Sequence, residues 1–272
     1  MTSPKLLTDS KSLLQQRARA SSDGLFLHDL AADEVQDRMG MVNRPFNSVA
    51  VVSGFPKNWA KILPQATTVT DDETLQLEPS QYDVVIHALG LHWANDPVGQ
   101  IIQCRRALRP DGLFLGATFG GETLNELRSC LGQAEIEVSG GLSPRIAPMG
   151  EIRDMGGLLQ RAGLALPVAD NQTTNVVYRD IWHLMHDLRA MGETNALTTR
   201  LRTSTRRAVF KRANELYQKT FPAAQGGITA TFDIVYLTGW SPDESQPKPL
   251  RPGSASARLA DALKTEEKPL SD

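Results

Sequence analysis

Apolar positions along the chain follow two spacings that alternate with each other. Short apolar or β-branched runs, which are typical of buried strands, occur at residues 48–52, 66–70, 82–89 and 113–118. Apolar residues at helical spacing predict helices at residues 26–40 and from Pro97 to Leu108. Strand, helix, strand in this order is the pattern of a parallel sheet with right-handed crossovers.

Turn and cap residues support these segments. Asp96-Pro97 predicts a helix start, because Asp caps a helix and proline is tolerated at its first position. Residues 109–112 (RPDG) predict a turn, and Gly163 predicts the end of a helix at 151–162.

The second half of the chain adds further segments of both kinds. Helices are predicted at 123–134, 151–162, 179–191 and 203–219, and a strand at 164–168. Residues 228–236 alternate apolar with mostly polar positions, which predicts an antiparallel strand late in the sheet.

We therefore predict an α/β fold with a doubly wound, mostly parallel sheet and an antiparallel late strand. Residues 1–25 are predicted to form an N-terminal helical arm and residues 26–240 the folded domain. Residues 241–272 are rich in Ser, Pro and charged side chains, which predicts a flexible C-terminal tail.

Composition excludes several classes of protein. The chain has 40% hydrophobic and 22% charged residues, as globular proteins do, and no apolar run approaches the ~20 residues that span a bilayer. A net charge of -2 gives no overall attraction for nucleic acid, and the basic run from Arg200 to Arg212 is predicted to be a solvated helix face. Cys104 and Cys130 are too few for a disulfide framework or a zinc site. They predict packing residues in a reducing cytoplasm and no bound metal.

Several motifs resemble a known family. The run from Tyr82 to Asp96 (YDVVIHALGLHWAND), followed by residues 107–112 (ALRPDG), resembles the fourth- and fifth-strand region of class I S-adenosylmethionine (SAM) methyltransferases. The match continues through residues 119–124 (FGGETL), 140–145 (GGLSPR), 158–163 (LLQRAG), 17–20 (RARA) and 26–29 (FLHD). Together these segments are similar to the mitochondrial complex I assembly factor 5 family and its alphaproteobacterial relatives.

This resemblance implies a Rossmann-like sheet that binds SAM. It also implies kinship with biotin-pathway malonyl-carrier methyltransferases. For the mitochondrial member it implies hydroxylation of an arginine in a complex I subunit.

The cofactor turn departs from the family pattern. Methyltransferases carry a glycine-rich turn after the first strand, because only glycine lets the backbone approach the methionine part of SAM closely. Here residues 53–57 read SGFPK, so Gly54 is the one glycine, Phe55 adds bulk and Pro56 lacks an N–H. Val51 stands where an acidic residue is usual.

The region after this turn is also short. Only the 13 residues 53–65 separate the first two predicted strands, and a parallel crossover needs about a dozen residues. One βα unit is therefore predicted to be missing, namely the family's second strand, whose carboxylate holds the ribose hydroxyls, with the helix after it.

The remaining candidates for cofactor binding lie at the ends of strands, where open α/β sheets place ligands. We predict Ser53, Gly54, Asp71, Asp72, Leu89, His92 and Trp93 as cofactor-binding residues and assign no catalytic residue. The resemblance places Asp71 or Asp72 beside the adenine ring, although both residues are also suited to cap a loop. Trp93 is equally suited to wedge under the next helix. Glu122 and Arg145 lie in loops on the substrate side and are not predicted to be catalytic.

Two functions remain open from the sequence. The first is a non-catalytic relative, a pseudoenzyme that binds a protein client or a paralogue and assists assembly. The second is an active SAM-dependent methyltransferase, or an arginine hydroxylase on that scaffold, acting on a protein or carrier-bound substrate. A missing strand and a pocket beside Gly54 that is filled by Phe55 or Trp59 would favour the first, and seven central strands with an open pocket the second.

Overall fold

The computed structural model describes residues 6–247, with a compact unit that ends at Pro242. Most of the predicted tail, residues 248–272, therefore lies outside the described residues. Six strands form one sheet: β1 (Val49–Ser53), β2 (Thr67–Val69), β3 (Tyr82–Ala88), β4 (Leu108–Phe119), β5 (Ala165–Tyr178) and β6 (Ile228–Trp240).

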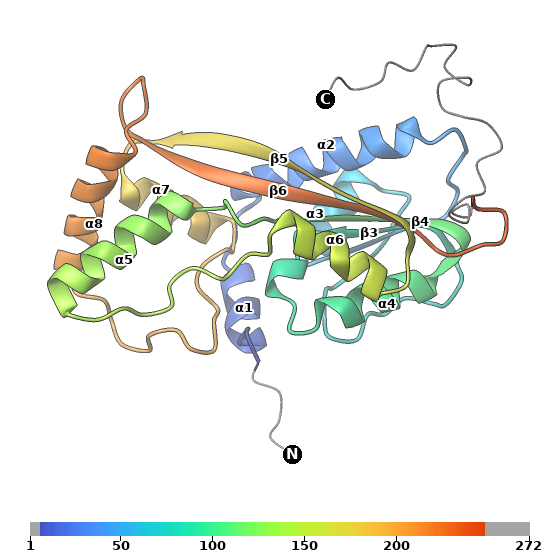
Figure 1. Ribbon diagram of the computed structural model, residues 1–272, viewed down its shortest axis with the longest axis horizontal. Coiled ribbons are helices and arrows are strands. Elements are labelled where there is room, and N and C mark those ends of the chain that lie inside the picture. The colour runs from blue at the N-terminus through green and yellow to red at the C-terminus, as the bar shows by residue number, and fades with distance from the viewer. Residues whose placement is uncertain (1–5, 248–272) are drawn as a thin grey trace, which may run out of the picture. The chain divides into compact units, whose positions relative to one another are not determined.

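Helices flank the sheet strands in the order that the sequence predicts (Figure 1). They are α1 (Ser10–Arg17), α2 (Phe26–Met41), α3 (Pro56–Ile62), α4 (Pro97–Ala107), α5 (Asn125–Ser139), α6 (Ile152–Arg161), α7 (Ile181–Ala190) and α8 (Arg207–Thr220). Two short 3₁₀ turns, η1 (Ser22–Gly24) and η2 (Leu91–Trp93), complete the elements.

The strand order is β2-β1-β3-β4-β6-β5, with β2, β1, β3 and β4 mutually parallel. Strand β6 runs antiparallel to both β4 and β5. The predicted doubly wound α/β fold with an antiparallel late strand is thus confirmed. Only the short helix α3 lies between β1 and β2, as expected of a sheet that lacks one βα unit.

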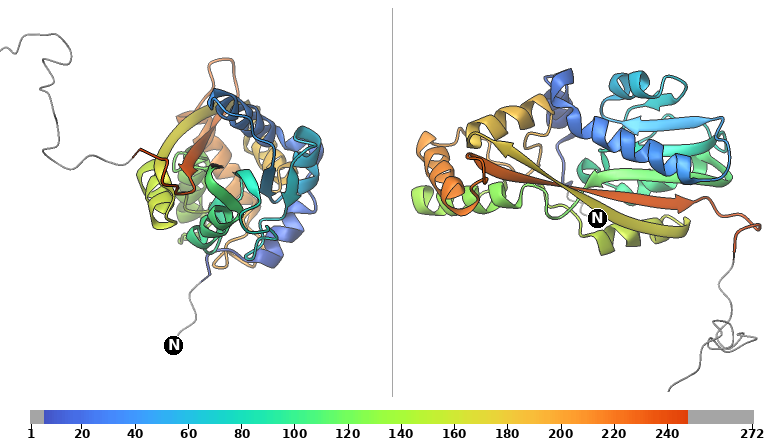
Figure 2. Two further views of the ribbon diagram at one scale, coloured as in Figure 1. Left: turned by 90° about the vertical axis from the view of Figure 1, so that its right-hand side faces the viewer. Right: turned by 90° about the horizontal axis from the view of Figure 1, so that it is seen from above.

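Alternate residues of the central strands enter two separate cores, because successive side chains of a strand point to opposite faces. Val51 and Ile86 pack in the cluster that holds Trp59 of α3. Val52 and Val85 pack in the cluster that holds residues of α4 and α6. A third cluster joins α5, α7 and α8 to the first half of β6. In Figure 1 the long strands β5 and β6 run across to this group of helices, and Figure 2 shows the same pair from above.

Three local predictions need correction. Strand β5 runs to Tyr178, not 168, because its polar second half is held by backbone pairing with β6 and not by an apolar face. Residues 109–112 lie inside an irregular start of β4, where the register with β3 shifts. The basic run is not one helix face, because Arg200 precedes α8 and binds Asp9 at 2.9 Å.

Candidate functional site

The carboxyl ends of β1, β2 and β3 meet at one edge of the sheet. Ser53 pairs with Ala88 in the register of β1 and β3, so Gly54 and the segment after Ala88 leave the sheet side by side. Asp71 follows β2 at the same edge, and its carboxylate is close enough to Gly90 to collide with any Cβ placed there. This part of the predicted cofactor site is therefore assembled in space.

Other predicted cofactor residues differ in their surroundings. The Ser53 hydroxyl accepts a hydrogen bond from the Phe55 N–H at 3.1 Å and is fully buried. Leu89 is buried in the apolar cluster of α5, α7 and α8. Asp72 is exposed and its carboxylate accepts a hydrogen bond from the Thr70 hydroxyl, the loop contact that the sequence offered as an alternative.

A residue that the sequence did not suggest occupies the centre of this edge. The Nη1 of Arg17, at the end of α1, donates to Asp71 Oδ1 at 2.7 Å, and both side chains are more than nine-tenths buried. A Cβ built on Gly54 would lie 2.6 Å from Arg17 Nε, so the guanidinium fills the space directly over the glycine. Neither Phe55 nor Trp59 does so, because Trp59 is in the core and Phe55 packs beside the guanidinium.

The ion pair sets the charge of Asp71. Burial alone would raise the pKa of this carboxyl, but the positive charge and hydrogen bond of Arg17 outweigh burial and hold the pKa below its usual value. Gln100 of α4 fixes the segment as well: its Nε2 donates to the carbonyl oxygens of Asp71 and Asp72, both at 3.1 Å. Its Oε1 lies 2.8 Å from Nε2 of the buried His87.

A polar cavity of about 210 Å³ lies beside this ion pair. Helix α1 forms one wall with Leu13 and Arg17, and the opposite wall includes Asp71, Gly90 and Trp93. The cavity therefore offers room at the Asp71 side of the predicted SAM site. Arg17 takes the space over Gly54 that the methionine part of SAM would need, so the residues in this arrangement fit one half of the cofactor and not the other.

A second cavity of about 210 Å³ lies on the other side of Trp93. Aromatic and aliphatic side chains line it, including Phe119, Phe210 and Phe232 from three different elements. Trp93 lines both cavities and is 5% exposed, so it is the wall between them.

Glu193, on the loop after α7, is the acidic group of this aromatic cavity. Its Oε2 accepts a hydrogen bond from Trp93 Nε1 at 2.7 Å and lies 3.1 Å from His92 Nε2. Burial would raise the pKa of Glu193, but the charge and hydrogen bond of His92, the charge of Arg17 and the Trp93 bond together lower it. The carboxylate is therefore ionised at neutral pH, and within the described chain its Oε1 accepts no hydrogen bond.

Sequence reasoning missed Glu193 because it lies about a hundred positions from its partners. The hydrogen bond joins residues 93 and 193, and no local spacing links the two. Thr194 lines the same cavity, and its buried hydroxyl has no hydrogen-bond partner among residues 6–247. Two consecutive polar side chains thus line this mainly apolar space, which Thr123, Arg145, Arg189 and Asn195 also line.

Arg145 is held by protein contacts and does not serve as a free anion site. Its guanidinium donates to both carboxylate oxygens of Glu135, at 3.0 and 2.6 Å, and to the Thr205 hydroxyl at 2.9 Å. Glu122 is exposed and accepts a hydrogen bond from Asn125 in the first turn of α5, consistent with solvation.

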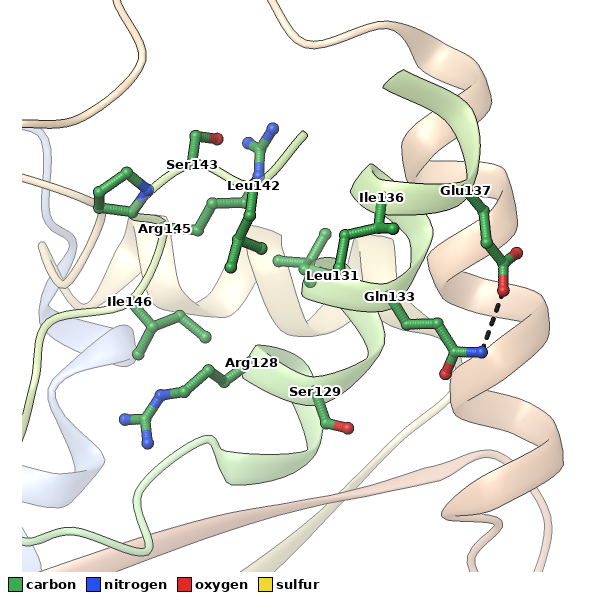
Figure 3. A pocket seen from close by; sticks show the side chains of 12 residues that line it. Arg128, Ser129, Leu131, Gln133, Ile136, Glu137, Leu142, Ser143, Arg145 and Ile146 are labelled. Atoms are coloured by element: carbon green, nitrogen blue, oxygen red, sulfur yellow. Dashed lines mark hydrogen bonds between the residues drawn. The ribbon is translucent and has the colours of Figure 1, made fainter. Parts of the chain in front are cut away.

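An open groove of about 730 Å³ lies between α5 and residues 142–146 (Figure 3). Ile136 and Leu142 line it and are 55% and 69% exposed. The groove shares Leu131, Arg145 and Ile146 with the aromatic cavity, so an apolar surface adjoins that cavity.

Within residues 6–247, no group of three or more His, Cys, Asp or Glu side chains is arranged to hold a metal ion. No helix in this range is long and apolar enough to cross a bilayer. Cys104 and Cys130 are free and buried, as predicted for packing residues.

Comparison with known proteins agrees with the resemblance drawn from the motifs. Residues 50–116 match the family described as methyltransferase domain, which supports SAM as the cofactor. The chain is 38% identical over 202 residues to the arginine-hydroxylase NDUFAF5, mitochondrial, of Danio rerio, covering 74% of this chain and 63% of the relative. The human protein of the same name is 37% identical over 199 residues, covering 73% and 57%.

A second group of relatives has a different named activity. The malonyl-[acyl-carrier protein] O-methyltransferase of Laribacter hongkongensis is 34% identical over 177 residues, covering 65% of this chain and 57% of the relative. The chain thus spans less than two thirds of the length of these three relatives. It is a protein of the SAM-dependent methyltransferase superfamily, similar to the relatives named arginine hydroxylase.

Proposed function

We propose that this chain binds a partner protein by taking an arginine side chain of that partner into the aromatic cavity, with Glu193 as the counter-ion. The carrying observation is the ionised, buried Glu193 carboxylate with one oxygen left for a ligand. The unpartnered Thr194 hydroxyl beside it supplies a second acceptor. The resemblance implies a client among the subunits of complex I.

Guanidinium chemistry fits the other walls of the cavity. An arginine side chain has an apolar stem and a planar cation that stacks on aromatic faces and donates to carboxylates in a fork. Trp93, Phe119 and Phe232 supply the aromatic faces. Arg145 is already neutralised by Glu135, and Arg189 lies exposed at the rim, so neither places an unscreened positive charge inside. The name arginine hydroxylase, which the Danio rerio and human relatives carry, is consistent with this ligand.

A second candidate is chemistry on the bound arginine with SAM as cofactor, as in an active methyltransferase or hydroxylase. The observation that favours it is Trp93, which lines both the aromatic cavity and the polar cavity at the cofactor edge. A substrate and a cofactor on its two sides would be separated by one side chain. The first function needs the aromatic cavity alone, and the second needs both.

The test is calorimetric titration of the purified chain with Nα-acetyl-L-arginine methylamide, and with the matching citrulline derivative, which lacks the charge. We expect the arginine derivative to bind and the citrulline derivative to bind at least about tenfold more weakly, because a hydrogen bond to a charged group contributes ~1.5–3 kcal/mol. Glu193→Gln should lose the preference, and Glu122→Gln, at an exposed carboxylate, should keep it.

Equal binding of the two derivatives, or an equal effect of the two variants, would refute the proposal. To separate the two candidates, the same chain is incubated with SAM and an arginine-containing peptide, and the peptide is weighed by mass spectrometry. A mass gain of one methylene group would establish methyl transfer. A gain of one oxygen atom in a parallel incubation that also contains dioxygen and a reductant would establish hydroxylation. Unchanged mass in both incubations with retained arginine binding would leave the partner-binding function.

The compartment is also a proposal. Two buried, free cysteines suit a reducing cytoplasm, whereas the names of the most similar relatives include the word mitochondrial. Fractionation of cells that express the tagged chain would decide between them.

A further inference from the structure

The position of Arg17 goes beyond the proposed function and does not depend on it. Arg17 ends helix α1, which the sequence assigns to an N-terminal arm, yet its side chain is only 6% exposed. The guanidinium lies over Gly54 and pairs with Asp71. Its Cζ also lies 5.9 Å from the centroid of the Phe55 ring. One side chain therefore contacts Gly54 and Phe55 of the cofactor turn as well as Asp71 at the end of β2.

The rest of the arm is tied down at its other end. The Thr8 N–H donates to Asn95 Oδ1 at 2.9 Å, and Asn95 Nδ2 donates back to the Thr8 carbonyl at 3.2 Å. The Asp9 N–H donates to the Ala196 carbonyl at 2.8 Å. Helix α1 is thus anchored beside the polar cavity, with Ser12, Leu13 and Arg17 as its buried residues.

The hydrogen bonding of Arg17 is incomplete. Its Nε and Nη2 are buried and have no hydrogen-bond partner within residues 6–247. Leaving a buried donor unsatisfied costs ~1–3 kcal/mol, more for a charged group. The guanidinium is held in place by one ion pair and by packing, which is an arrangement that a better-paired ligand can displace.

We propose that Arg17 is an intramolecular plug of the cofactor crevice: its guanidinium occupies the site of the methionine part of SAM and must leave before SAM can bind. Either the Arg17 guanidinium or the methionine part of SAM then lies over Gly54, and only a residue without Cβ leaves room for either group. Asp71 also has two alternative partners. It pairs with Arg17 while the guanidinium occupies the crevice, and it can contact SAM once Arg17 has left.

The plug predicts an unusual direction of effect. Removing a charged side chain from a binding site normally weakens binding, but removing a competing occupant strengthens it. Arg17→Met should therefore bind SAM, and S-adenosylhomocysteine, at least about tenfold more tightly than the unaltered chain, which corresponds to ~1.4 kcal/mol. Arg19→Met is the matched control, because Arg19 is exposed on the same arm.

Calorimetry on the three proteins gives the affinities, and circular dichroism melts check that each is folded. Breaking one half of a buried pair is destabilising, so Arg17→Met with Asp71→Asn serves as a second variant that removes both charges. Hydrogen exchange of the unaltered chain supplies an independent readout: saturating SAM should speed the exchange of amides in residues 10–17.

Three results would overturn the plug. The first is weaker SAM binding by Arg17→Met, which would make Arg17 a direct cofactor ligand. The second is equal or absent binding in both folded Arg17 variants and the unaltered chain. The third is exchange in residues 10–17 that SAM leaves unchanged or slows. Arginine binding in the aromatic cavity is measured with a different probe, so failure of the plug and failure of the proposed function can be told apart.

Discussion

Buried His28 should make the stability of the fold depend on pH. His28 of α2 is 5% exposed, and its Nδ1 accepts a hydrogen bond from Trp59 Nε1 at 3.1 Å, behind the cofactor turn. Burial lowers the pKa of His28 from 6.5 to about 4. The imidazole is therefore neutral in the folded chain, and Nδ1 is the unprotonated nitrogen.

The sign follows from proton uptake in the two states. Between pH 6.5 and about 4 the unfolded chain binds a proton at His28 and the folded chain does not, so unfolding becomes more favourable as the pH falls. Because of the difference between these two pKa values, His28 lowers the free energy of unfolding by about 2 kcal/mol at pH 5. The loss reaches about 3 kcal/mol at pH 4. His87, whose pKa burial also lowers, acts in the same direction.

Urea unfolding at pH 7, 6 and 5 measures this effect. The free energy of unfolding should fall steadily across the series, and His28→Asn should make the fall smaller by about 2 kcal/mol, since asparagine keeps an acceptor for Trp59 but takes up no proton. His183→Asn, at an exposed position of α7, should leave the slope unchanged. An unaltered slope in His28→Asn would refute a neutral buried histidine.

Three further substitutions test other parts of the structure. Trp93→Phe keeps an aromatic wall but removes the Nε1–H that donates to Glu193, so calorimetry should show a several-fold weaker affinity for the arginine derivative. Trp59→Ala empties a fully buried site and should lower the free energy of unfolding in urea by ~3–5 kcal/mol. Asp96→Ala removes the side chain that accepts from the Gly99 N–H at 2.8 Å, and the same assay should show a loss of ~1 kcal/mol.

Elements with a strong local signal were predictable from the sequence. The apolar runs of β1 and β3 are buried on both faces, so consecutive positions such as Val49–Val52 and Val84–Ile86 carry the signal. The cap at Asp96 and the glycine stop at Gly163, whose φ is +76°, act through their own backbone neighbourhoods. Such features need no knowledge of the rest of the chain.

The second half of β5 shows where this approach fails. Residues 169–177 are exposed or half-buried and largely polar, so no apolar periodicity distinguishes them from a loop. Their partner is the edge of β6, which pairs with them throughout this stretch. Backbone hydrogen bonds do not depend on the side chains, and a strand held mainly by them leaves little trace in the sequence.

Some residues of the candidate site were likewise predictable from the order of elements, and others were not. The ends of parallel strands meet at one sheet edge by topology, so the proximity of Gly54, Asp71 and Trp93 was predictable from the order of elements. Glu193 and Arg17 reach the edge from a loop and from the arm, at positions that no strand register fixes. The one signal for Arg17 was its place in a segment that resembles the family, and the resemblance assigned no role to it.

Arg17 also links the two cavities electrostatically. Its Cα would lie 3.1 Å from a Cβ on Gly192, next to Glu193, and its charge is among the causes that lower the pKa of Glu193. The positive charge of Arg17 stabilises the ionised carboxylate and would at the same time repel a cation that approaches from the aromatic side. Movement of Arg17 therefore changes the field at Glu193 even if the aromatic walls stay still. The proposed plug therefore predicts that SAM binding at the cofactor edge changes the affinity of the aromatic cavity for a guanidinium.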